Sequence, residues 1–132
     1  MIRALDISTS ALVAQRTRLD VIAGNIANAE VTRQADGTPL PYRRRMVTFM
    51  SGDGRGGPGV HVDAVRADPS PFRAVYDPQH ADADARGYVQ LPNVSITMEY
   101  VDAMAASRAY EANAAMLNIT RSMVQQAIRL FA

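Results

Sequence analysis

Apolar residues recur every three or four positions along the last forty residues of the chain, from Asn93 to Ala132. No Gly or Pro interrupts the segment after Pro92. A 3.5-residue apolar repeat of this length predicts one long helix that lies along other helices, either as the core helix of a bundle or as part of a larger assembly. Only one member is polar in the row, which consists of Ala105, Ala109, Ala112, Met116, Ile119, Met123, Gln126 and Leu130.

A second apolar row runs through residues 2–29 and predicts another helix. Asp6 or Ser8 is a suitable N-cap for it, and Asn28, which tolerates left-handed backbone geometry, is a suitable C-cap. Because both helices carry an apolar row, they must lie together if both rows are to be buried. The second row consists of Leu5, Ser8, Leu12, Gln15, Leu19, Ile22, Ile26 and Ala29.

The segment between the helices holds all seven prolines and seven of the eight glycines, so it cannot be helical throughout. Short strands are predicted at Tyr42–Met50, Gly59–Arg66 and Phe72–Tyr76, with a hairpin loop at Ser51–Gly59. The expected fold class is mainly α with a small β-rich insert, and the long N- and C-terminal helices are expected to pair as in a coiled coil. The expected domains are a discontinuous helical domain, residues 1–31 and 93–132, and an irregular β unit, residues 32–92.

Composition excludes several classes of protein. The 132 residues include no cysteine, so disulfides and cysteine-based metal sites or nucleophiles are impossible. A net charge of +1 gives no overall electrostatic reason to bind nucleic acid or acidic membranes. The longest uncharged run, residues 87–98, is too short to span a membrane, which takes about 20 apolar residues. Asp6 and several hydroxyls stand where a cleaved signal peptide has its apolar core, so we expect no such peptide.

Three consecutive arginines, Arg43, Arg44 and Arg45, invite a nucleic-acid interpretation, which needs a broad basic face. Residues 56–93 of the same insert carry three Arg and five Asp, so the basic stretch is balanced by an acidic one. Pairing with carboxylates of the same or a neighbouring subunit therefore fits better. We expect the three arginines to make insert contacts, and we expect no nucleic-acid partner.

The stretch around Asp82 and Asp84 superficially resembles a calcium loop, but Arg86 and Asn93 occupy positions at which that loop requires ligands. The two histidines lack the spacing of metal ligands, and no Ser or Asp lies in a nucleophile elbow or a catalytic triad motif. We therefore expect no metal, no cofactor and no catalytic activity.

Near the end of the first predicted helix lies a motif of alternating small, polar and apolar residues: Gly24, Asn25, Ile26, Ala27 and Asn28. From the residues alone, the two asparagines, one helical turn apart, are explained by an ordinary helix C-cap. The motif also resembles the N-terminal signature of bacterial flagellar rod and hook proteins. The resemblance extends, in order and at the expected spacing, to PYRRR at 41–45, GYVQLPNV at 87–94 and SRAYEAN at 107–113, and with the chain length it indicates the short proximal-rod members.

The resemblance implies a structural subunit of the flagellar basal-body proximal rod, the tubular shaft that crosses the periplasm and transmits torque for motility. The implied partners are copies of the chain, other rod proteins and the flagellar type III export apparatus, through which the subunit passes unfolded and without a cleaved signal peptide. Packing between subunits is then expected of Leu5, Leu12, Leu19, Ile22, Ile26, Ala105, Ala109, Ala112, Met116, Ile119, Met123 and Leu130.

A different class of function is a soluble helical adaptor whose apolar row binds one partner in a helix-in-groove mode. An adaptor needs one exposed row, whereas a tube subunit needs contacts on several faces. Apolar residues that lie outside the main row of the last helix favour the tube, and these are Val101, Ala115, Leu117, Val124 and Ile128.

Overall fold

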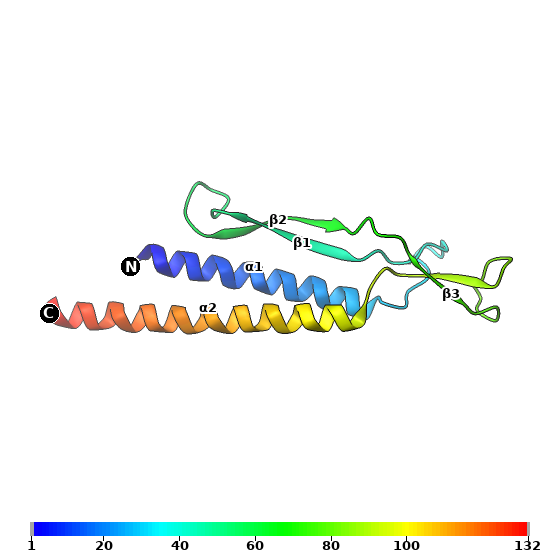
Figure 1. The fold of residues 1–132 in the computed structure, drawn as a ribbon. Helices are drawn as coiled ribbons and strands as arrows, with labels where there is room; N and C mark the ends of the chain where they lie inside the picture. Colours follow the sequence, from blue (N-terminus) through cyan, green and yellow to red (C-terminus); the bar gives the residue numbers. More distant parts are fainter. Residues whose placement is uncertain (1, 132) are drawn as a thin grey trace.

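The computed structural model describes residues 2–131, which form two long helices and four short strands. Helix α1 (Ile2–Ala27) and helix α2 (Ile96–Phe131) lie side by side and run in opposite directions (Figure 1). All four strands belong to the segment between the helices. The predicted fold class, mainly helical with a small β-rich insert, is confirmed. Over the described residues, neither helix combines the length and the apolar character needed to cross a membrane.

The two ends of α1 differ in how well the sequence predicts them. The helix begins at Ile2, so Asp6 and Ser8 both lie inside it, and the prediction that either is the N-cap is wrong. Arg3, Ala4 and Leu5, which directly follow Ile2, are good helix formers, so the helix starts before either predicted cap. Asn28 caps the C-terminal end as predicted, since its backbone N–H and its Nδ2 donate to the Gly24 carbonyl oxygen at 3.1 and 2.7 Å. It does so without a positive φ.

Both helices bury a row of side chains. In α1 the predicted row is buried or half-buried, with Ser8 and Ile22 among its buried members. In α2 the buried residues are Glu99, Ala106 and Thr120, which are spaced by multiples of seven. Since α1 is the one regular element that packs against α2, this row faces α1. We call it the inner row, and with its half-buried members it consists of Glu99, Ala106, Asn113, Leu117, Thr120 and Val124.

The row that the sequence pattern picks out in α2 lies one residue nearer the N-terminus than the inner row. One residue is about 100° around a helix, so this predicted row does not face α1 and is mostly exposed in the single chain. A 3.5-residue repeat cannot tell the two rows apart, because each is largely apolar. We call the predicted row the outer row: Ala105, Ala109, Ala112, Met116, Ile119, Met123, Gln126 and Leu130.

Strands β1 (Arg45–Ser51) and β2 (Val60–Ala67) form an antiparallel hairpin that lies along α1 (Figure 1). Helix α1 is therefore packed between α2 and this hairpin. Both strands were predicted, and the glycine-rich segment between them is the predicted loop. Strand β1 begins three residues later than predicted, because the backbone N–H of Arg44 donates to the Asn93 side chain at 2.8 Å and not to a neighbouring strand.

Strands β3 (Arg73–Tyr76) and β4 (Tyr88–Leu91) form a second antiparallel hairpin, which projects beyond the ends of the helices (Figure 1). Strand β3 was predicted. Strand β4 was not, because its four residues between Gly87 and Pro92 are too few to show a period of two. The hairpin buries one side chain of β4, Val89, and leaves most others exposed.

The loop end of the β1–β2 hairpin rests against the first half of α1. The backbone N–H of Val60 donates to the Ser10 hydroxyl at 3.1 Å. The preceding Gly59 has φ +132°, and a Cβ at this position would lie 2.5 Å from Ser10 Oγ. Both the backbone conformation and the lack of space require glycine here.

We predict that Gly59→Ala loosens the hairpin from α1 and lowers the free energy of unfolding by about 1–3 kcal/mol, since it adds a steric clash to backbone strain. Gly56→Ala is the matched control, because Gly56 has φ +90° but no atom within 4 Å of an added Cβ. Hydrogen exchange of the β2 amides measures the loosening. Equal protection in the two variants would argue against the contact with Ser10.

Candidate functional site

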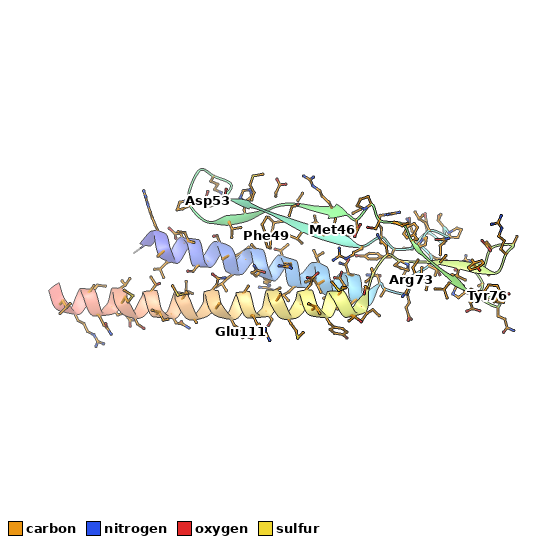
Figure 2. The ribbon with its side chains drawn as sticks, viewed as in Figure 1. Met46, Phe49, Asp53, Arg73, Tyr76 and Glu111 are labelled. Carbon is orange, nitrogen blue, oxygen red and sulfur yellow. The ribbon has the colours of Figure 1, made fainter. Side chains whose placement is uncertain are left out.

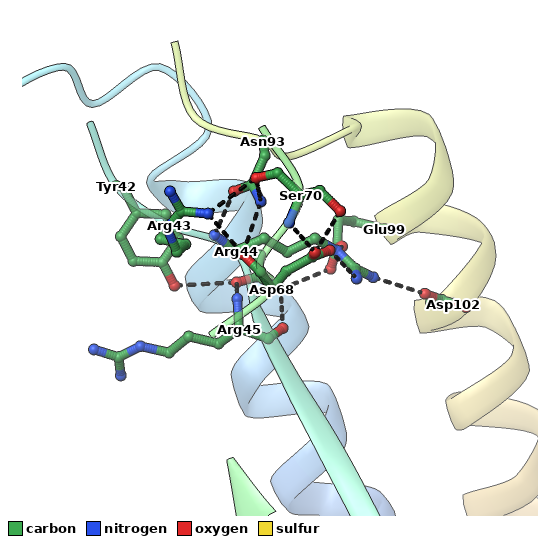
Figure 3. A network of polar contacts seen from close by, with 10 residues as sticks. Tyr42, Arg43, Arg44, Arg45, Asp68, Ser70, Asn93, Glu99 and Asp102 are labelled. Atoms are coloured by element: carbon green, nitrogen blue, oxygen red, sulfur yellow. Dashed lines mark hydrogen bonds and ion pairs between the residues drawn. The ribbon is translucent and has the colours of Figure 1, made fainter. Parts of the chain in front are cut away.

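A network of polar side chains lies where the end of α1, the start of α2 and the start of β1 meet (Figure 3). Its members come from five separate segments of the chain, so it ties the insert to both helices. We call it the junction network, and it consists of Arg18, Asn25, Tyr42, Arg44, Asp68, Asn93, Glu99 and Asp102.

Asn25, the second residue of the motif Gly24–Asn28, is at the centre of the network and is fully buried. Its Nδ2 donates to the Arg45 carbonyl at 2.8 Å and to Glu99 Oε2 at 3.1 Å. Its Oδ1 accepts from the Arg45 backbone N–H at 2.9 Å and from the Tyr42 hydroxyl at 3.0 Å. An asparagine amide has two donor hydrogens and two acceptor lone pairs, so all four are used. No other side chain of this size supplies the same set.

Glu99, in the first turn of α2, is also fully buried. A carboxylate removed from water is costly unless it is paired and hydrogen-bonded. Here Oε1 accepts from Arg44 Nε at 2.5 Å and Oε2 accepts from Asn25. The charge is therefore neutralised by an arginine of the insert, and the second oxygen is satisfied by α1. Glu99 therefore connects α2 both to the insert and to α1.

The Arg44 guanidinium contacts three carboxylates. Besides Glu99, it contacts Asp68 at 3.3 Å and Asp102 at 3.5 Å, and Asp102 also pairs with Arg18 of α1 at 3.5 Å. Burial by itself lowers the pKa of Arg44, but the hydrogen bond and charge of Glu99, followed by those of Asp68, outweigh burial and raise it. The guanidinium is fixed in its charged form.

The segment around Asn93 links β1 to the chain that follows β2. Asn93 Oδ1 accepts from the Arg44 backbone N–H, and Asn93 Nδ2 donates to the carbonyl oxygens of Asp68 and Ser70 at 3.2 and 3.1 Å. Hydrogen bonds from the Ser70 hydroxyl and backbone N–H hold the pKa of Asp68 below its usual value. Burial raises the pKa of Tyr42, with Glu99 adding to the rise.

The three predicted insert-contact arginines lie in three different environments. Arg44 is in the junction network. Arg43 donates to the carbonyl oxygens of Asp68 and Ser70 at 2.8 and 2.9 Å, and its guanidinium lies 4.2 Å from the centre of the Phe72 ring. Arg45 contributes its backbone, while its exposed side chain points away from the network (Figure 3). Arg45 is thus the one of the three that is turned outward.

The other members of the motif have smaller roles within the chain. Asn28 caps α1, Ile26 is half-buried and Ala27 is exposed. The Gly24 carbonyl oxygen accepts hydrogen bonds from Asn28, and a Cβ added at Gly24 would meet nothing within 4 Å. Within residues 2–131, no contact requires a glycine at this position.

The residues predicted to pack between subunits fall into two sets. Those on α1, which are Leu5, Leu12, Leu19, Ile22 and Ile26, are buried or half-buried within the chain. Those on α2 belong to the outer row, where Met116 and Ile119 are each 54% exposed and Leu130 is 84% exposed. The single chain therefore leaves an apolar surface open along most of α2.

A groove continues this open surface toward the insert. Its apolar lining is Val21 and Ile22 of α1 with Met46, Val47 and Phe49 of β1, of which Met46 and Phe49 are labelled in Figure 2. Its charged lining is Arg18, Arg44, Arg45, Glu99 and Asp102. Asp102 is seven residues before Ala109 of the outer row, so both lie on the same side of α2. Glu111 lies on the face of α2 away from α1 (Figure 2).

The acidic residues of the insert are engaged in local contacts. Asp82 is paired with Arg33 and accepts from the Thr32 hydroxyl at 2.8 Å. Asp84 Oδ1 accepts from the backbone N–H groups of Arg86 and Tyr88, which closes the turn before β4. Across residues 2–131 no three His, Asp or Glu side chains are grouped so as to hold a metal ion.

Sequence reasoning missed the partners of the motif. Asn25 and Arg44 were singled out, but Glu99, Asn93 and Asp68 were not. One signal was present: Glu99 is the acidic residue that opens a row whose later members are mainly apolar or hydroxylated. A charge at such a position indicates an internal cation, and the run 43–45 supplied three candidates.

Comparisons with known proteins cover both helices. A family model described as "Flagella basal body rod protein" matches residues 5–33, and one described as "Flagellar basal body rod FlgEFG protein C-terminal" matches residues 85–130. The chain is 43% identical to the flagellar basal-body rod protein FlgC of Bacillus subtilis, over 96% of this chain and 95% of that protein. It is 41% identical to FlgC of Salmonella typhimurium, over 98% and 97%, and 39% identical to FlgC of Aquifex aeolicus, over 93% and 91%.

We predict that Asn25→Asp lowers the free energy of unfolding by about 3 kcal/mol or more, because it places a second carboxylate against Glu99 and removes two buried donors. Asn28→Asp is the matched control. It makes the same chemical change at a half-buried helix cap, where we expect the free energy of unfolding to fall by about 1 kcal/mol. Urea unfolding followed by circular dichroism measures the free energy of unfolding of both variants. A loss of stability as small for Asn25→Asp as for Asn28→Asp would contradict the central role of Asn25.

Proposed function

The chain belongs to the family of flagellar basal-body rod proteins, as a member of the FlgC type, and we propose that it is a structural subunit of the proximal part of that rod. In this role it assembles with copies of itself and with related rod proteins into the tubular shaft that transmits torque for motility. The single observation that carries the proposal is the outer row of α2, an apolar surface that one chain leaves uncovered.

The outer row has the character of a helix-packing surface. It carries no charged residue from Ala105 to Leu130, and three of its members are alanines, which let a neighbouring helix approach closely. Its methionines adapt to partners of uneven shape. Monomeric proteins rarely expose an apolar strip of this length, so a partner is expected to cover it.

The groove beside β1 supports contact by more than one element of a neighbour. Its lining includes Asp102, which is seven residues before Ala109 of the outer row, so we propose that a helix packed on α2 also reaches Met46 and Phe49. Gly24 is a further place for close approach, because no atom of the chain fills the space beside it. We propose that residues 1–31 and 93–132 form the packed wall of the tube and that residues 32–92 make the outer contacts.

The role we propose is structural and not catalytic. The buried carboxylates of the junction network are satisfied by Arg44 and Asn25, and they are used to join elements. As the family resemblance implies, we further propose that the subunit reaches a rod crossing the periplasm through the flagellar type III export apparatus, without a cleaved signal peptide. Nucleic acid is not among the proposed partners.

We predict that Ile119→Asp abolishes incorporation into the rod. The side chain is 54% exposed in the single chain, so the charge is tolerated before assembly, but it would be buried without a partner in the helix interface. Such burial costs several kcal/mol. Swimming in soft agar and the subunit content of purified basal bodies are the measurements, in cells that carry the variant as their sole copy.

Ser122→Asp is the matched control, since Ser122 is also exposed on α2 but lies outside the outer row. It should incorporate normally. Normal swimming of the Ile119→Asp strain would contradict the packing surface, and so would equal loss of swimming in both strains.

We also predict that Arg45→Glu and Arg44→Glu fail at different stages. Arg44→Glu places a fourth carboxylate among Glu99, Asp68 and Asp102, so the purified chain should lose several kcal/mol of stability. Arg45→Glu keeps the backbone bonds to Asn25, so the chain should fold normally and lose only assembly. Thermal unfolding of the purified variants and swimming of the strains separate the two effects. Full motility of the Arg45→Glu strain would remove Arg45 from the proposed contacts.

A further inference from the structure

A second groove is lined by the segment that joins α1 to β1 and by the end of the β1–β2 hairpin. Its volume is about 1000 Å³, at the upper end of the range of about 300–1000 Å³ that is usual for ligand sites, so it has room for several side chains. Arg45 of β1 pairs with Ala67 of β2, and alternate residues of a strand share a face, so Arg45, Val65 and Ala67 lie on one face of the hairpin. We call it the basic groove, and besides these three its lining includes Val31, Arg33, Leu40 and Arg43.

The charged side chains that line the basic groove are all of one sign. Arg33, Arg43 and Arg45 line it, and across residues 2–131 no Asp or Glu belongs to the lining. The chain as a whole has 14 basic and 13 acidic residues, so the local excess of positive charge does not follow from composition. A groove of this kind attracts an anionic partner.

Of the three arginines, Arg45 is the one available to a partner. Arg33 is paired with Asp82, and Arg43 donates to two backbone carbonyl oxygens. Within residues 2–131 the Arg45 guanidinium makes no hydrogen bond or ion pair, and it extends away from the junction network (Figure 3). Since Asn25 fixes the Arg45 backbone, the guanidinium is presented at a defined place, where it can bind a carboxylate through two parallel hydrogen bonds.

Open apolar side chains accompany this arginine in the groove. Val31, Leu40 and Val65 are 37%, 44% and 45% exposed. A small anion would bind Arg45 and leave them in water, whereas a peptide can cover them with apolar side chains next to its carboxylate. Apolar area rimmed by polar groups, with an arginine anchor, is typical of surfaces that bind another protein.

We propose that the basic groove binds a short acidic segment of a partner protein, with a carboxylate of that segment on Arg45 and neighbouring apolar side chains on Val65 and Leu40. The inference rests on the proposed function, in which the insert makes the outer contacts, and it names the chemistry that these contacts recognise. Charge complementarity between the groove and the segment steers the encounter and fixes its register.

Nucleic acid fits the same groove less well. Binding to single strands depends on aromatic rings on which bases stack. Of the two aromatic side chains in the lining, Phe72 has the Arg43 guanidinium over its ring, and Tyr42 is held by its hydroxyl against Asn25. A single available arginine also offers little to a chain of phosphates.

Site-specific photo-cross-linking in assembled basal bodies tests the proposal. The photoreactive residue p-benzoylphenylalanine takes the place of the exposed Val65, in cells that carry the variant as their sole copy. Mass spectrometry of the cross-linked peptides should identify one partner segment with an Asp or Glu within a few residues of the cross-link. The matched control places the same photoreactive residue at the exposed Arg66, the next position of β2 and on the opposite face of the hairpin, and it should not label that segment.

A labelled segment without carboxylates would overturn the proposal, as would labelling of nucleic acid alone. Absence of any cross-link in basal bodies that contain the variant would overturn it too. If the Val65 variant is not incorporated, the photoreactive residue is placed at Leu40, which lines the same groove and is also exposed.

A charge exchange then tests the ion pair itself. Arg45→Glu should lower incorporation into basal bodies about tenfold or more, and an arginine in place of the labelled carboxylate of the partner should restore it in the same strain. Arg66→Glu, the same change on the opposite face of the hairpin, should be incorporated normally. Failure of the exchange to restore incorporation would overturn the proposed pair. Normal incorporation of Arg45→Glu alongside exclusion of Ile119→Asp would remove the acidic segment and leave the proposed rod function standing.

Discussion

The contact between Asn25 and Glu99 determines how the rest of the molecule is arranged. It joins the last turns of α1 to the first turn of α2 through two fully buried side chains, and Arg44 connects the insert to the same point. Because neither residue can be left without its partner at that depth, only one register of the helix pair satisfies both. The register then decides which row of α2 is covered, how far the C-terminal end of α2 extends past the start of α1 (Figure 1) and where the β1–β2 hairpin is attached.

The contacts that fix the register of the helix pair lie at one end of it, and the side chains that could bury apolar area lie elsewhere along it. At the junction, geometry is set by charged and amide groups with few alternatives. Farther along, α2 covers α1 with small or polar side chains such as Ala106, Asn113 and Thr120, which bury little apolar area. The larger apolar side chains, Met116, Ile119 and Met123, stay outside. The single chain is therefore well defined at one end of the pair, and much of its apolar area is left for other subunits.

The period of the apolar residues was sufficient to locate both helices to within about three residues, and clusters of Gly and Pro located the insert and its long hairpin. It was not sufficient to choose between adjacent rows of α2, because that choice depends on Glu99 meeting Asn25, a pairing that has no local signature. Strand β4 was missed because four residues carry too little pattern. The prediction that the motif Gly24–Asn28 marks a helix end was correct for Asn28. The role of Asn25 could not be predicted, because its partners, Tyr42, Arg45 and Glu99, lie in two other segments of the chain.

The sequence separation within the junction network has a consequence for the order of events in folding. Asn25 and Glu99 are 74 positions apart, and Arg44 and Asp102 are 58 apart. Contacts across such distances close long loops, which costs entropy before any contact is gained and slows folding. A chain of which only the first ninety residues are free lacks Asn93, Glu99 and Asp102, so it cannot complete the network. The native register of the helix pair therefore forms late, once the C-terminal segment is also free to fold. Until then, the N-terminal segment has formed no competing register that it would have to lose.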